Sequence, residues 1–412
     1  MSGIVIIGAG QAGASVAARA RALGFSGPIT MIGDEPMAPY QRPPLSKGYL
    51  LGETSLERLF LRAPSFWKDN AIDLKLGAPV MAIDRETKTV KLGEESVRYD
   101  QLVLATGSSA RRLPAAVGGQ LDGVYTIRTL ADVDAMAVEF RAGRKLLIVG
   151  GGYIGLEAAA VGAKLGLKVT LIEMAPRILQ RVAALATSDF FRELHTGHGV
   201  AIRENIGLDR LTGVGRVSGA RLSDASELEV DFVIVGIGIA PRTQLASDAG
   251  LVIDNGVVTD AFGRTSDPSI WAAGECASFS LGGGRIRLES VGHAIDHGEL
   301  VAQNMVGASG PYEARPWFWS DQYDVKLQIA GLNAGHDRIV VREGDGNSRS
   351  VWYYRRAQLL ALDAMNDPRS YMVGKRVIEA GQTILPEQVS DTSIDVKSLQ
   401  SLAIKVTRAS AA

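Results

Sequence analysis

Residues 3–34 read GIVIIGAGQAGASVAARARALGFSGPITMIGD, and this stretch decides the fold. The apolar run Ile4–Ile7 predicts a strand, and the alanine-rich segment Ala12–Leu23 predicts a helix that Gly24 stops. A second short apolar run, Ile29–Ile32, predicts another strand. Strand, helix and strand in this order form a βαβ unit, in which the two strands lie parallel in a buried sheet.

The turn between the first strand and the helix is rich in glycine. It carries Gly8, Gly10 and Gly13 in the spacing G-x-G-x-x-G, and Asp34 follows 21 residues after the last of them. In dinucleotide-binding domains such glycines make a tight turn, admit a pyrophosphate to the helix N-terminus and let the helix pack closely, while the acid accepts ribose hydroxyls. The alternative is a turn without a ligand, but the strand, helix and acid around it favour a binding site.

A second copy of this pattern begins 142 residues further on. Lys145–Val149 and Lys168–Glu173 predict strands, and Ile154–Leu165 predicts the helix between them. The turn before this helix supplies the candidate binding residues Gly150, Gly152, Tyr153, Ile154 and Gly155. Two complete fingerprints predict two dinucleotide-binding domains, for which FAD and NADH are the natural pair of cofactors.

The carboxylate of Glu173 decides between the two nicotinamide cofactors. It follows Gly155 by 18 residues, at the end of the second strand of its βαβ unit, with no arginine directly beside it. A carboxylate there accepts a hydrogen bond from the free 2′-hydroxyl of NADH and repels the 2′-phosphate of NADPH. The second site is therefore expected to prefer NADH.

Composition limits the classes of function. The 412 residues carry 44 Lys and Arg against 45 Asp and Glu, a net charge of −1, so no basic field is present that would hold nucleic acid. No apolar run is long enough to cross a bilayer, and the N-terminus shows no charged leader, so a cytoplasmic protein without a membrane partner is expected. The single cysteine, Cys276, excludes an internal disulfide and a dithiol redox pair.

Beyond Gly310 the texture of the sequence changes. An aromatic cluster, residues 317–319, is followed by alternating patterns at Val351–Tyr354 and Leu359–Leu362, which predict antiparallel strands. We therefore predict an α/β chain with two Rossmann-like domains and a C-terminal α+β domain that starts near residue 314.

Several longer motifs resemble one family. They are Pro39-Tyr-Gln-Arg-Pro-Pro-Leu-Ser-Lys47, Ala105-Thr-Gly107, Gly150-Gly-Gly-Tyr-Ile-Gly-Leu-Glu157, Ala273-Gly-Glu-Cys-Ala277 and Trp317-Phe-Trp-Ser-Asp-Gln322. Their order is similar to that of the oxygenase-coupled NADH-dependent ferredoxin reductases, over essentially the whole chain. The resemblance implies a glutathione reductase-like fold, with an FAD domain at 1–108 and 239–313, an NADH domain at 109–238 and a C-terminal domain at 314–412.

The resemblance also implies roles for single residues. Lys47 and Glu157 would pair near the flavin N5 edge and form the catalytic pair, although from spacing alone Lys47 could equally be a surface lysine and Glu157 an ordinary helix residue. A buried Lys–Glu pair is tolerable where either charge alone is costly. The other residues implied to bind FAD or NADH are Arg42, Ala105, Thr106, Gly107, Gly238, Glu275, Val291 and Trp319. Trp319 could alternatively be a core aromatic of the C-terminal domain.

The sequence departs from the family pattern at a few positions. Glu275 replaces an Asp that bonds a ribityl hydroxyl, Arg242 replaces an Asn, and His293 and His297 replace Asn and Gln on a helix. The i, i+4 spacing of the histidines also fits a metal pair, but no third ligand is near in the sequence, so no metal is expected. That helix is instead expected to point its N-terminus at the flavin.

With one cysteine, electrons are expected to leave directly from the flavin to an external acceptor. The resemblance implies a 2Fe-2S ferredoxin that serves a monooxygenase or a dioxygenase. Rubredoxin, or another small acceptor such as a quinone or peroxide, is the alternative. A rival of another class is a redox-dependent signalling or DNA-binding flavoprotein that shares the Arg-Pro-Pro-Leu-Ser-Lys segment, against which the near-zero net charge argues.

Overall fold

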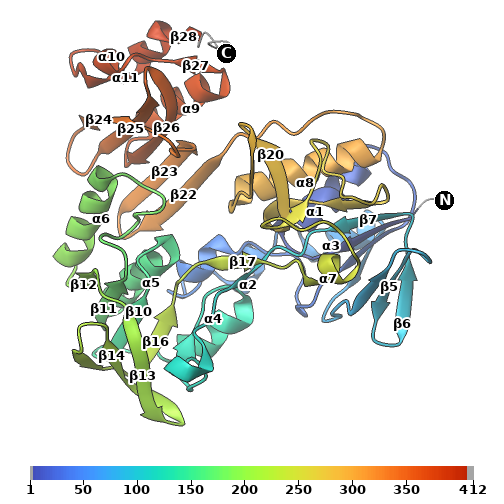
Figure 1. Ribbon diagram of the computed structural model, residues 1–412, viewed down its shortest axis with the longest axis horizontal. Helices are drawn as coiled ribbons and strands as arrows, with labels where there is room; N and C mark the ends of the chain where they lie inside the picture. The colour runs from blue at the N-terminus through green and yellow to red at the C-terminus, as the bar shows by residue number, and fades with distance from the viewer. Residues whose placement is uncertain (1–2, 406–412) are drawn as a thin grey trace. The chain divides into compact units, whose positions relative to one another are not determined.

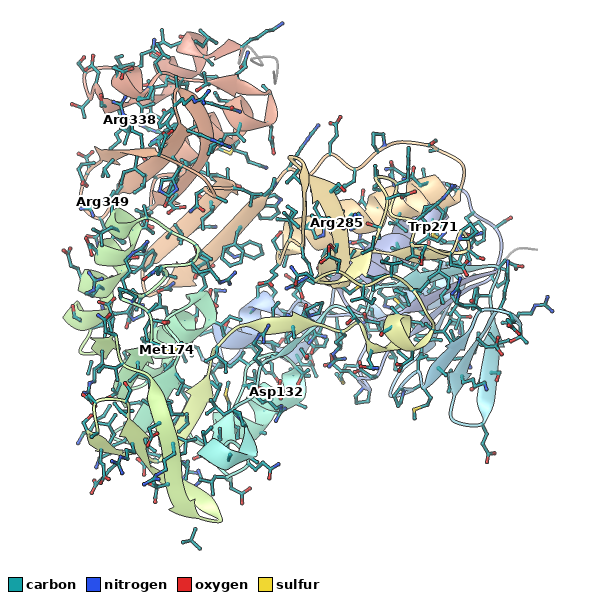
Figure 2. The ribbon with its side chains drawn as sticks, in the orientation of Figure 1. Asp132, Met174, Trp271, Arg285, Arg338 and Arg349 are labelled. Carbon is teal, nitrogen blue, oxygen red and sulfur yellow. The ribbon has the colours of Figure 1, made fainter. Side chains whose placement is uncertain are left out.

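The computed structural model describes residues 3–405 and is drawn in Figure 1. Contacts divide these residues into two units. The first contains residues 3–44, 54–109 and 239–316, and the second contains 45–53, 110–238 and 317–405. No helix among the described residues is long and apolar enough to cross a membrane. Figure 2 shows the side chains of the described residues in the same orientation.

The first unit is built on a parallel sheet of five strands in the order β19-β7-β1-β2-β3. These strands are β1 (Ile4–Ile7), β2 (Ile29–Ile32), β3 (Ile72–Lys75), β7 (Gln101–Leu104) and β19 (Ile270–Ala272). Alternate residues of the central strands belong to two apolar clusters, because successive side chains of a strand point to opposite faces. Both faces are therefore buried, as the continuous apolar runs predict.

Different elements cover the two faces of this sheet. Helices α1 (Gln11–Ala22) and α8 (Val291–Met305) pack against each other over one face. The other face carries the antiparallel strands β4 (Ala82–Asp84), β5 (Thr89–Leu92) and β6 (Glu95–Arg98) and the helix α7 (Gln244–Asp248). Shorter elements complete the unit: α2 (Leu56–Leu59), α3 (Pro64–Asp69), β8 (Ser108–Ala110), β17 (Ile239–Pro241), β18 (Val257–Val258), β20 (Ala277–Leu281) and β21 (Gly284–Ile286).

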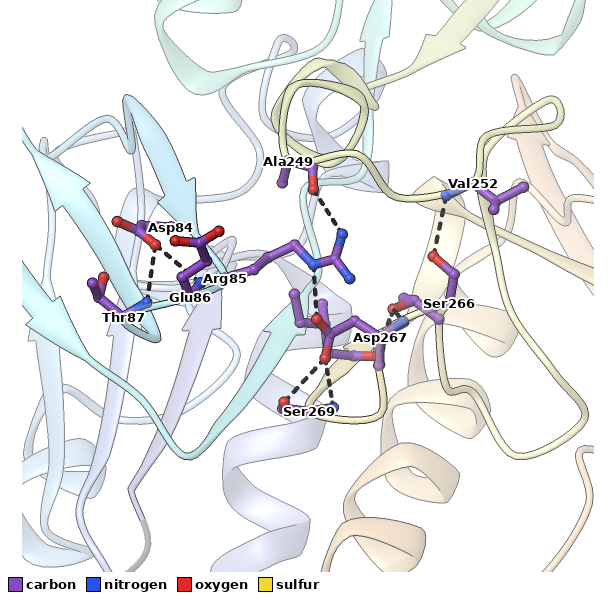
Figure 3. A network of polar contacts seen from close by, with 11 residues as sticks. Asp84, Arg85, Glu86, Thr87, Ala249, Val252, Ser266, Asp267 and Ser269 are labelled. Atoms are coloured by element: carbon purple, nitrogen blue, oxygen red, sulfur yellow. Dashed lines mark hydrogen bonds and ion pairs between the residues drawn. The ribbon is translucent and has the colours of Figure 1, made fainter.

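A polar network joins segments of the first unit that are far apart in sequence (Figure 3). Arg85 donates to the carboxylate of Asp267 at 2.8 Å and to the carbonyl of Ala249 at 3.2 Å. The other oxygen of Asp267 accepts hydrogen bonds from Ser269. Burial alone would raise the pKa of Asp267, but the hydrogen bonds from Arg85 and Ser269 together with the Arg85 charge lower it below its usual value.

Replacing Arg85 with methionine should lower the free energy of unfolding at neutral pH by about 0.5–1 kcal/mol, a small value because Arg85 is partly exposed. A lowered native pKa stabilises the protein above the unfolded pKa, and this stabilisation is lost as the pH falls through the native value. The gap between Arg85→Met and the wild type, followed by thermal denaturation, should therefore close below about pH 3.8. Arg98→Met, at an exposed position of β6, is the control, and an equal loss there would contradict the assignment.

The second unit contains a second five-stranded parallel sheet, in the order β12-β11-β10-β16-β9. Its strands are β9 (Val124–Tyr125), β10 (Lys145–Val149), β11 (Lys168–Glu173), β12 (Ala201–Glu204) and β16 (Phe232–Val235), with helices α4 (Leu130–Ala137), α5 (Tyr153–Lys164) and α6 (Leu185–Gly197). An antiparallel meander of β13 (Leu208–Val214), β14 (Arg216–Leu222) and β15 (Glu227–Glu229) packs on it.

The C-terminal part of this unit is an antiparallel sheet in the order β22-β23-β26-β25-β24. Its strands are β22 (Trp317–Gln322), β23 (Val325–Gly331), β24 (Arg338–Glu343), β25 (Arg349–Arg355) and β26 (Gln358–Met365). Helices α9 (Pro368–Glu379), α10 (Pro386–Ser390) and α11 (Val396–Leu399) cover one face, beside the short pair β27 (Gln382–Thr383) and β28 (Ile404–Lys405). The predicted fold class, two Rossmann-like sheets and a C-terminal α+β part, is confirmed.

Residues 45–53 pack with the second unit although their neighbours on both sides belong to the first. This segment carries Lys47 to the helix that holds Glu157. The sequence-based domain limits at 108, 238 and 313 remain predictions.

Candidate functional site

The first glycine turn has the geometry that a dinucleotide requires. Gly8 has φ +118°, and a Cβ on Gly13 would lie 2.0 Å from the carbonyl oxygen of Gly8, so helix and strand meet backbone to backbone. A Cβ on Gly10 would meet nothing within 4 Å. Gly10 is also the N-cap of α1 and provides no side-chain cap, which leaves the helix N-terminus open to an anionic group. These residues fit a pyrophosphate.

Further candidate residues meet the turn at the same edge of the sheet. Strands β1, β7 and β19 are parallel neighbours, so Gly8, Ala105 and Glu275 all follow carboxyl ends of adjacent strands. A Cβ on Gly8 would lie 2.1 Å from the carbonyl oxygen of Ala105, which shows how closely two of these loops approach. The hydroxyl of Thr106 donates to the carbonyl of Arg242 at 2.7 Å, and the backbone N–H of Arg242 donates to the carbonyl of Gly107 at 2.9 Å.

Two acids follow β2, and the fingerprint spacing points to Asp34 alone. Asp34 pairs with Arg242 at 2.6 Å, with both side chains about half exposed. Glu35 is more buried and accepts hydrogen bonds from Arg42 and from the hydroxyl of Tyr40, each at 2.5 Å. Glu35 is therefore a second candidate for a ribose contact, and fingerprint spacing cannot distinguish acids one residue apart.

Arg42 belongs to this charged group. Burial opposes its charge, but Tyr40, Glu35 and Glu275 raise the pKa of the guanidinium above its usual value. A permanently charged guanidinium near Glu35 and Glu275 suits recognition of an anionic cofactor.

Helix α8 carries the other first-unit candidates. It begins at Val291, and Ser290 caps it by accepting a hydrogen bond from the backbone of His293 at 3.2 Å. His293 and His297 are buried, with ring centroids 5.0 Å apart; His293 shares a hydrogen bond with Tyr312, and the backbone N–H of Gly274 donates to His297. Burial lowers the pKa of His293 to about 4. Among residues 3–405, no group of three or more His, Cys, Asp or Glu is arranged to hold a metal ion.

The second glycine turn repeats the first. Gly150 has φ +109°, and a Cβ on Gly155 would lie 2.1 Å from its carbonyl oxygen, while a Cβ on Gly152 would meet nothing within 4 Å. Gly152 caps α5 without a side chain. The carboxylate of Glu173, at the end of β11, accepts hydrogen bonds from the backbone of Gly151 at 2.7 Å and of Ala175 at 2.8 Å, so its position is fixed.

The remaining candidates of this turn lie at the start of α5 and after β16. The ring of Tyr153 lies 4.8 Å from that of Phe318, and its buried hydroxyl has no hydrogen-bond partner among the described residues. Ile154 is exposed, and Gly238 follows β16 with φ +95°. Trp319 lies on β22 and stacks on Trp317 at 5.5 Å.

The structure brings Lys47 and Glu157 together. The Nζ of Lys47 lies 2.9 Å from Oε1 of Glu157, and the side chains are only 16% and 4% exposed. Two serines that no sequence motif indicates also donate hydrogen bonds to this carboxylate: Ser46 to Oε2 at 2.5 Å, and Ser320 to Oε1 at 2.6 Å. A buried charge with a partner and further donors is stable, whereas either charge alone would be costly.

Cys276 lies in the interior of the first unit. Its thiol is buried and contacts the carbonyls of Leu104 at 3.3 Å and Ala273 at 3.4 Å. Burial raises the pKa of the thiol, which disfavours a reactive thiolate. The only cysteine of the chain is thus a packing residue in this structure.

Comparison with known proteins decides the family. A model described as pyridine nucleotide-disulphide oxidoreductase matches residues 2–298, and one described as reductase C-terminal matches residues 317–400. The chain belongs to the pyridine nucleotide-disulphide oxidoreductase family. With one cysteine, this member lacks the dithiol that the family description implies.

Full-length relatives narrow the comparison. The chain is 46% identical to a ferredoxin--NAD(P)(+) reductase of Sphingomonas sp, over 93% of this chain and 94% of the relative, and 41% identical to rhodocoxin reductase of Rhodococcus erythropolis, over 96% and 93%. It superposes on the reductase of a covalent putidaredoxin reductase–putidaredoxin complex with a TM-score of 0.94, at 38% identity, over 97% and 98% of the two chains. The predicted relationship to ferredoxin reductases of oxygenase systems is confirmed.

Proposed function

We propose that this family member is an FAD-dependent NADH:ferredoxin oxidoreductase that passes electrons to a 2Fe-2S ferredoxin of a monooxygenase or dioxygenase system. The observation that carries the proposal is the pair of glycine turns of equal geometry in a chain with a single, buried cysteine. Electrons that enter from a nicotinamide have no dithiol through which to leave, so they must pass directly from the flavin to an external acceptor. The full-length similarity to ferredoxin reductases supports this choice.

The two glycine turns would bind different cofactors. The turn at Gly8–Gly13, with Arg42, Glu35 or Asp34, and Glu275, would hold FAD, and the turn at Gly150–Gly155 with Glu173 would hold NADH. When bound, FAD accepts two electrons as hydride and releases them one at a time. Lys47 and Glu157 would balance the charge that accumulates during this step, because they form a buried pair that responds to a new neighbouring charge.

The proposal places the protein in the cytoplasm, where NADH is supplied. The single buried thiol is compatible with a reducing compartment, since no disulfide has to form.

The direct test is reduction of an acceptor by NADH. The purified holoenzyme should be yellow and should reduce, without oxygen, the 2Fe-2S ferredoxin encoded nearest to its gene. Rubredoxin serves as the second acceptor in the same assay. Reduction of rubredoxin but of no ferredoxin would replace the proposal with the rubredoxin alternative, and a preparation that binds no FAD would overturn both.

Cofactor choice gives a further prediction. Glu173→Gln removes the charge while keeping an acceptor for the backbone of Gly151 or Ala175. It therefore tests repulsion of the 2′-phosphate with little change to the structure of the turn. We expect the ratio of kcat/KM for NADH over NADPH to fall by about tenfold, mainly through the KM for NADPH. Glu173→Ala should narrow the gap too, but it also releases the two backbone donors. Equal use of both cofactors by the wild type would contradict the assignment.

A further inference from the structure

A chain of side-chain hydrogen bonds continues from Glu157 through the interior of the second unit. Ser320 donates to Glu157 at 2.6 Å, and Gln322 donates through Nε2 to the hydroxyl of Ser320 at 3.1 Å. The Oε1 of Gln322 lies 2.7 Å from Nε2 of His195, and the hydroxyl of Tyr323 lies 3.2 Å from Nδ1 of the same ring. The chain thus joins the Lys47–Glu157 pair to the partly exposed Tyr323.

Three elements supply the groups between Glu157 and His195. Ser320 and Gln322 are two residues apart on β22, so their side chains leave the strand on one face. That face meets Glu157 on α5 and His195 on α6. Ser320, Gln322 and His195 are each at most 1% exposed, so solvent cannot replace the hydrogen bonds between them. An apolar trio of similar volume would avoid the cost of burying these polar groups, which argues for a role beyond packing.

The chemistry of each group fixes the direction of every bond. The carboxylate of Glu157, paired with Lys47, can only accept, so Ser320 donates to it. Ser320 then accepts from the amide NH2 of Gln322, which turns the carbonyl of Gln322 toward His195. A carbonyl only accepts, so the proton of His195 sits on Nε2, and Nδ1 accepts from Tyr323. Burial lowers the pKa of His195 to about 4, which keeps the ring neutral as this order requires.

We propose that Gln322 and His195 are positioning residues that hold the carboxylate of Glu157 in place for Lys47, through Ser320. This inference rests on the proposed role of the Lys47–Glu157 pair in flavin reduction. Donors that all point one way polarise each other and strengthen the last bond, here the bond to the carboxylate. Without Gln322, the hydroxyl of Ser320 loses the donor that orients it, and Glu157 loses part of the stabilisation of its charge.

The direction of the hydrogen bonds from Tyr323 to Glu157 can be tested without any turnover. The chain contains five histidines, so a 15N-histidine-labelled, deuterated holoenzyme gives a simple long-range 15N–1H spectrum. At neutral pH, His195 should be neutral with its proton on Nε2, and Gln322→Met should remove that preference. A proton on Nδ1 in the wild type would mean that the Gln322 amide faces the other way, and this would overturn the proposal.

The effect on the pair is tested by rapid reduction with NADH. Gln322→Met removes both bonds at similar volume, and Gln322→Glu replaces the amide donor to Ser320 with a second carboxylate close to Glu157. Both should slow flavin reduction by about three- to tenfold at unchanged KM for NADH and shift the flavin potential, because each weakens a charge-assisted hydrogen bond. Tyr323→Phe, at the far end, should have a smaller effect.

Thr187→Val is the matched control. Thr187 lies on the same helix as His195 and is fully buried. It donates to Asp363 at 2.7 Å and takes no part in the hydrogen bonds that lead to Glu157. It should lower stability without changing the reduction rate or potential. Wild-type rates and potential in both Gln322 variants would overturn the inference while leaving the role of Lys47 and Glu157 intact if their own variants are impaired. Wild-type behaviour of those variants as well would instead refute the proposed role of the pair.

Discussion

Replacing Gly10 with valine is expected to yield a folded but colourless protein. A side chain at Gly10 meets no protein atom within 4 Å, and its backbone, at φ −96° and ψ −163°, is extended, so valine fits the fold. The added carbons instead occupy the space beside the open N-terminus of α1, where a pyrophosphate would approach the backbone. Loss of charge-assisted hydrogen bonds to backbone N–H groups should weaken FAD binding by about 100-fold or more.

Gly152→Val is the reciprocal variant. Gly152 stands at the same place in the second turn, with φ −81° and ψ 179°, and again nothing lies within 4 Å of an added Cβ. Each substitution places valine at a helix N-cap, so the local cost to stability is similar, roughly 1 kcal/mol. We expect Gly152→Val to stay yellow and to require far more NADH for reduction.

The measurements are flavin absorbance relative to protein after gel filtration, the KM for NADH and the thermal unfolding midpoint. Gly13→Ala should differ from both variants, because its Cβ would collide with the carbonyl of Gly8 at 2.0 Å, so it should fail to fold rather than lose a ligand. Full FAD content in Gly10→Val, or loss of FAD from Gly152→Val, would contradict the assignment of the two turns.

The βαβ units were predictable because glycines and apolar runs bound them tightly. Both strands of each unit have the predicted limits, and the first helix runs over Gln11–Ala22 where Ala12–Leu23 was predicted. The ends of strands that no glycine or polar residue marks are harder to predict from the sequence. Strand β16 ends at Val235 although the apolar run continues to Ile237, because the following Gly236 begins the approach to the second turn.

A glycine also ends strand β19 of the first unit. β19 covers Ile270–Ala272, and a single 3-10 turn follows at Gly274–Cys276, where Gly274 adopts φ +75°. Its added Cβ would lie 2.7 Å from that of Ala12, so helix packing demands the glycine and ends the strand. The antiparallel meanders β4–β6 and β13–β15 had no strong sequence signal, since many of their residues are exposed.

Only the parts of the site that consist of residues close together in the sequence were predictable from spacing. Fingerprint spacing located the two turns, and their geometry agrees with that reading. The pairing of Lys47 with Glu157 came from family resemblance, because 110 residues separate them and only the tertiary fold brings residues 45–53 to α5. Long-range partners of single polar residues, such as His195 for Gln322, leave no periodic trace in one sequence.

Alanine at Lys47 or Glu157 should slow reduction of the flavin by NADH while leaving FAD bound, since the proposed FAD contacts lie elsewhere. Glu157→Ala leaves the ammonium of Lys47 without its carboxylate, at a cost of roughly 3 kcal/mol or less, because the Lys47 side chain is 16% exposed and can be partly hydrated. Lys47→Ala leaves a carboxylate that, among the described residues, Ser46 and Ser320 stabilise, and it removes the positive charge proposed to balance the reduced flavin. We expect each rate to fall by about 10- to 100-fold.

Stopped-flow bleaching with excess NADH, alongside FAD content, measures this effect, and Glu157→Gln separates charge from shape because it keeps an acceptor for the serines. The double variant adds a stronger test. If the two side chains act as one unit, removing the second should cost less than removing it from the wild type, whereas independent surface groups would give additive effects. Normal rates in both single variants with full FAD content would show that the pair only stabilises the fold, since a buried ion pair can serve packing alone.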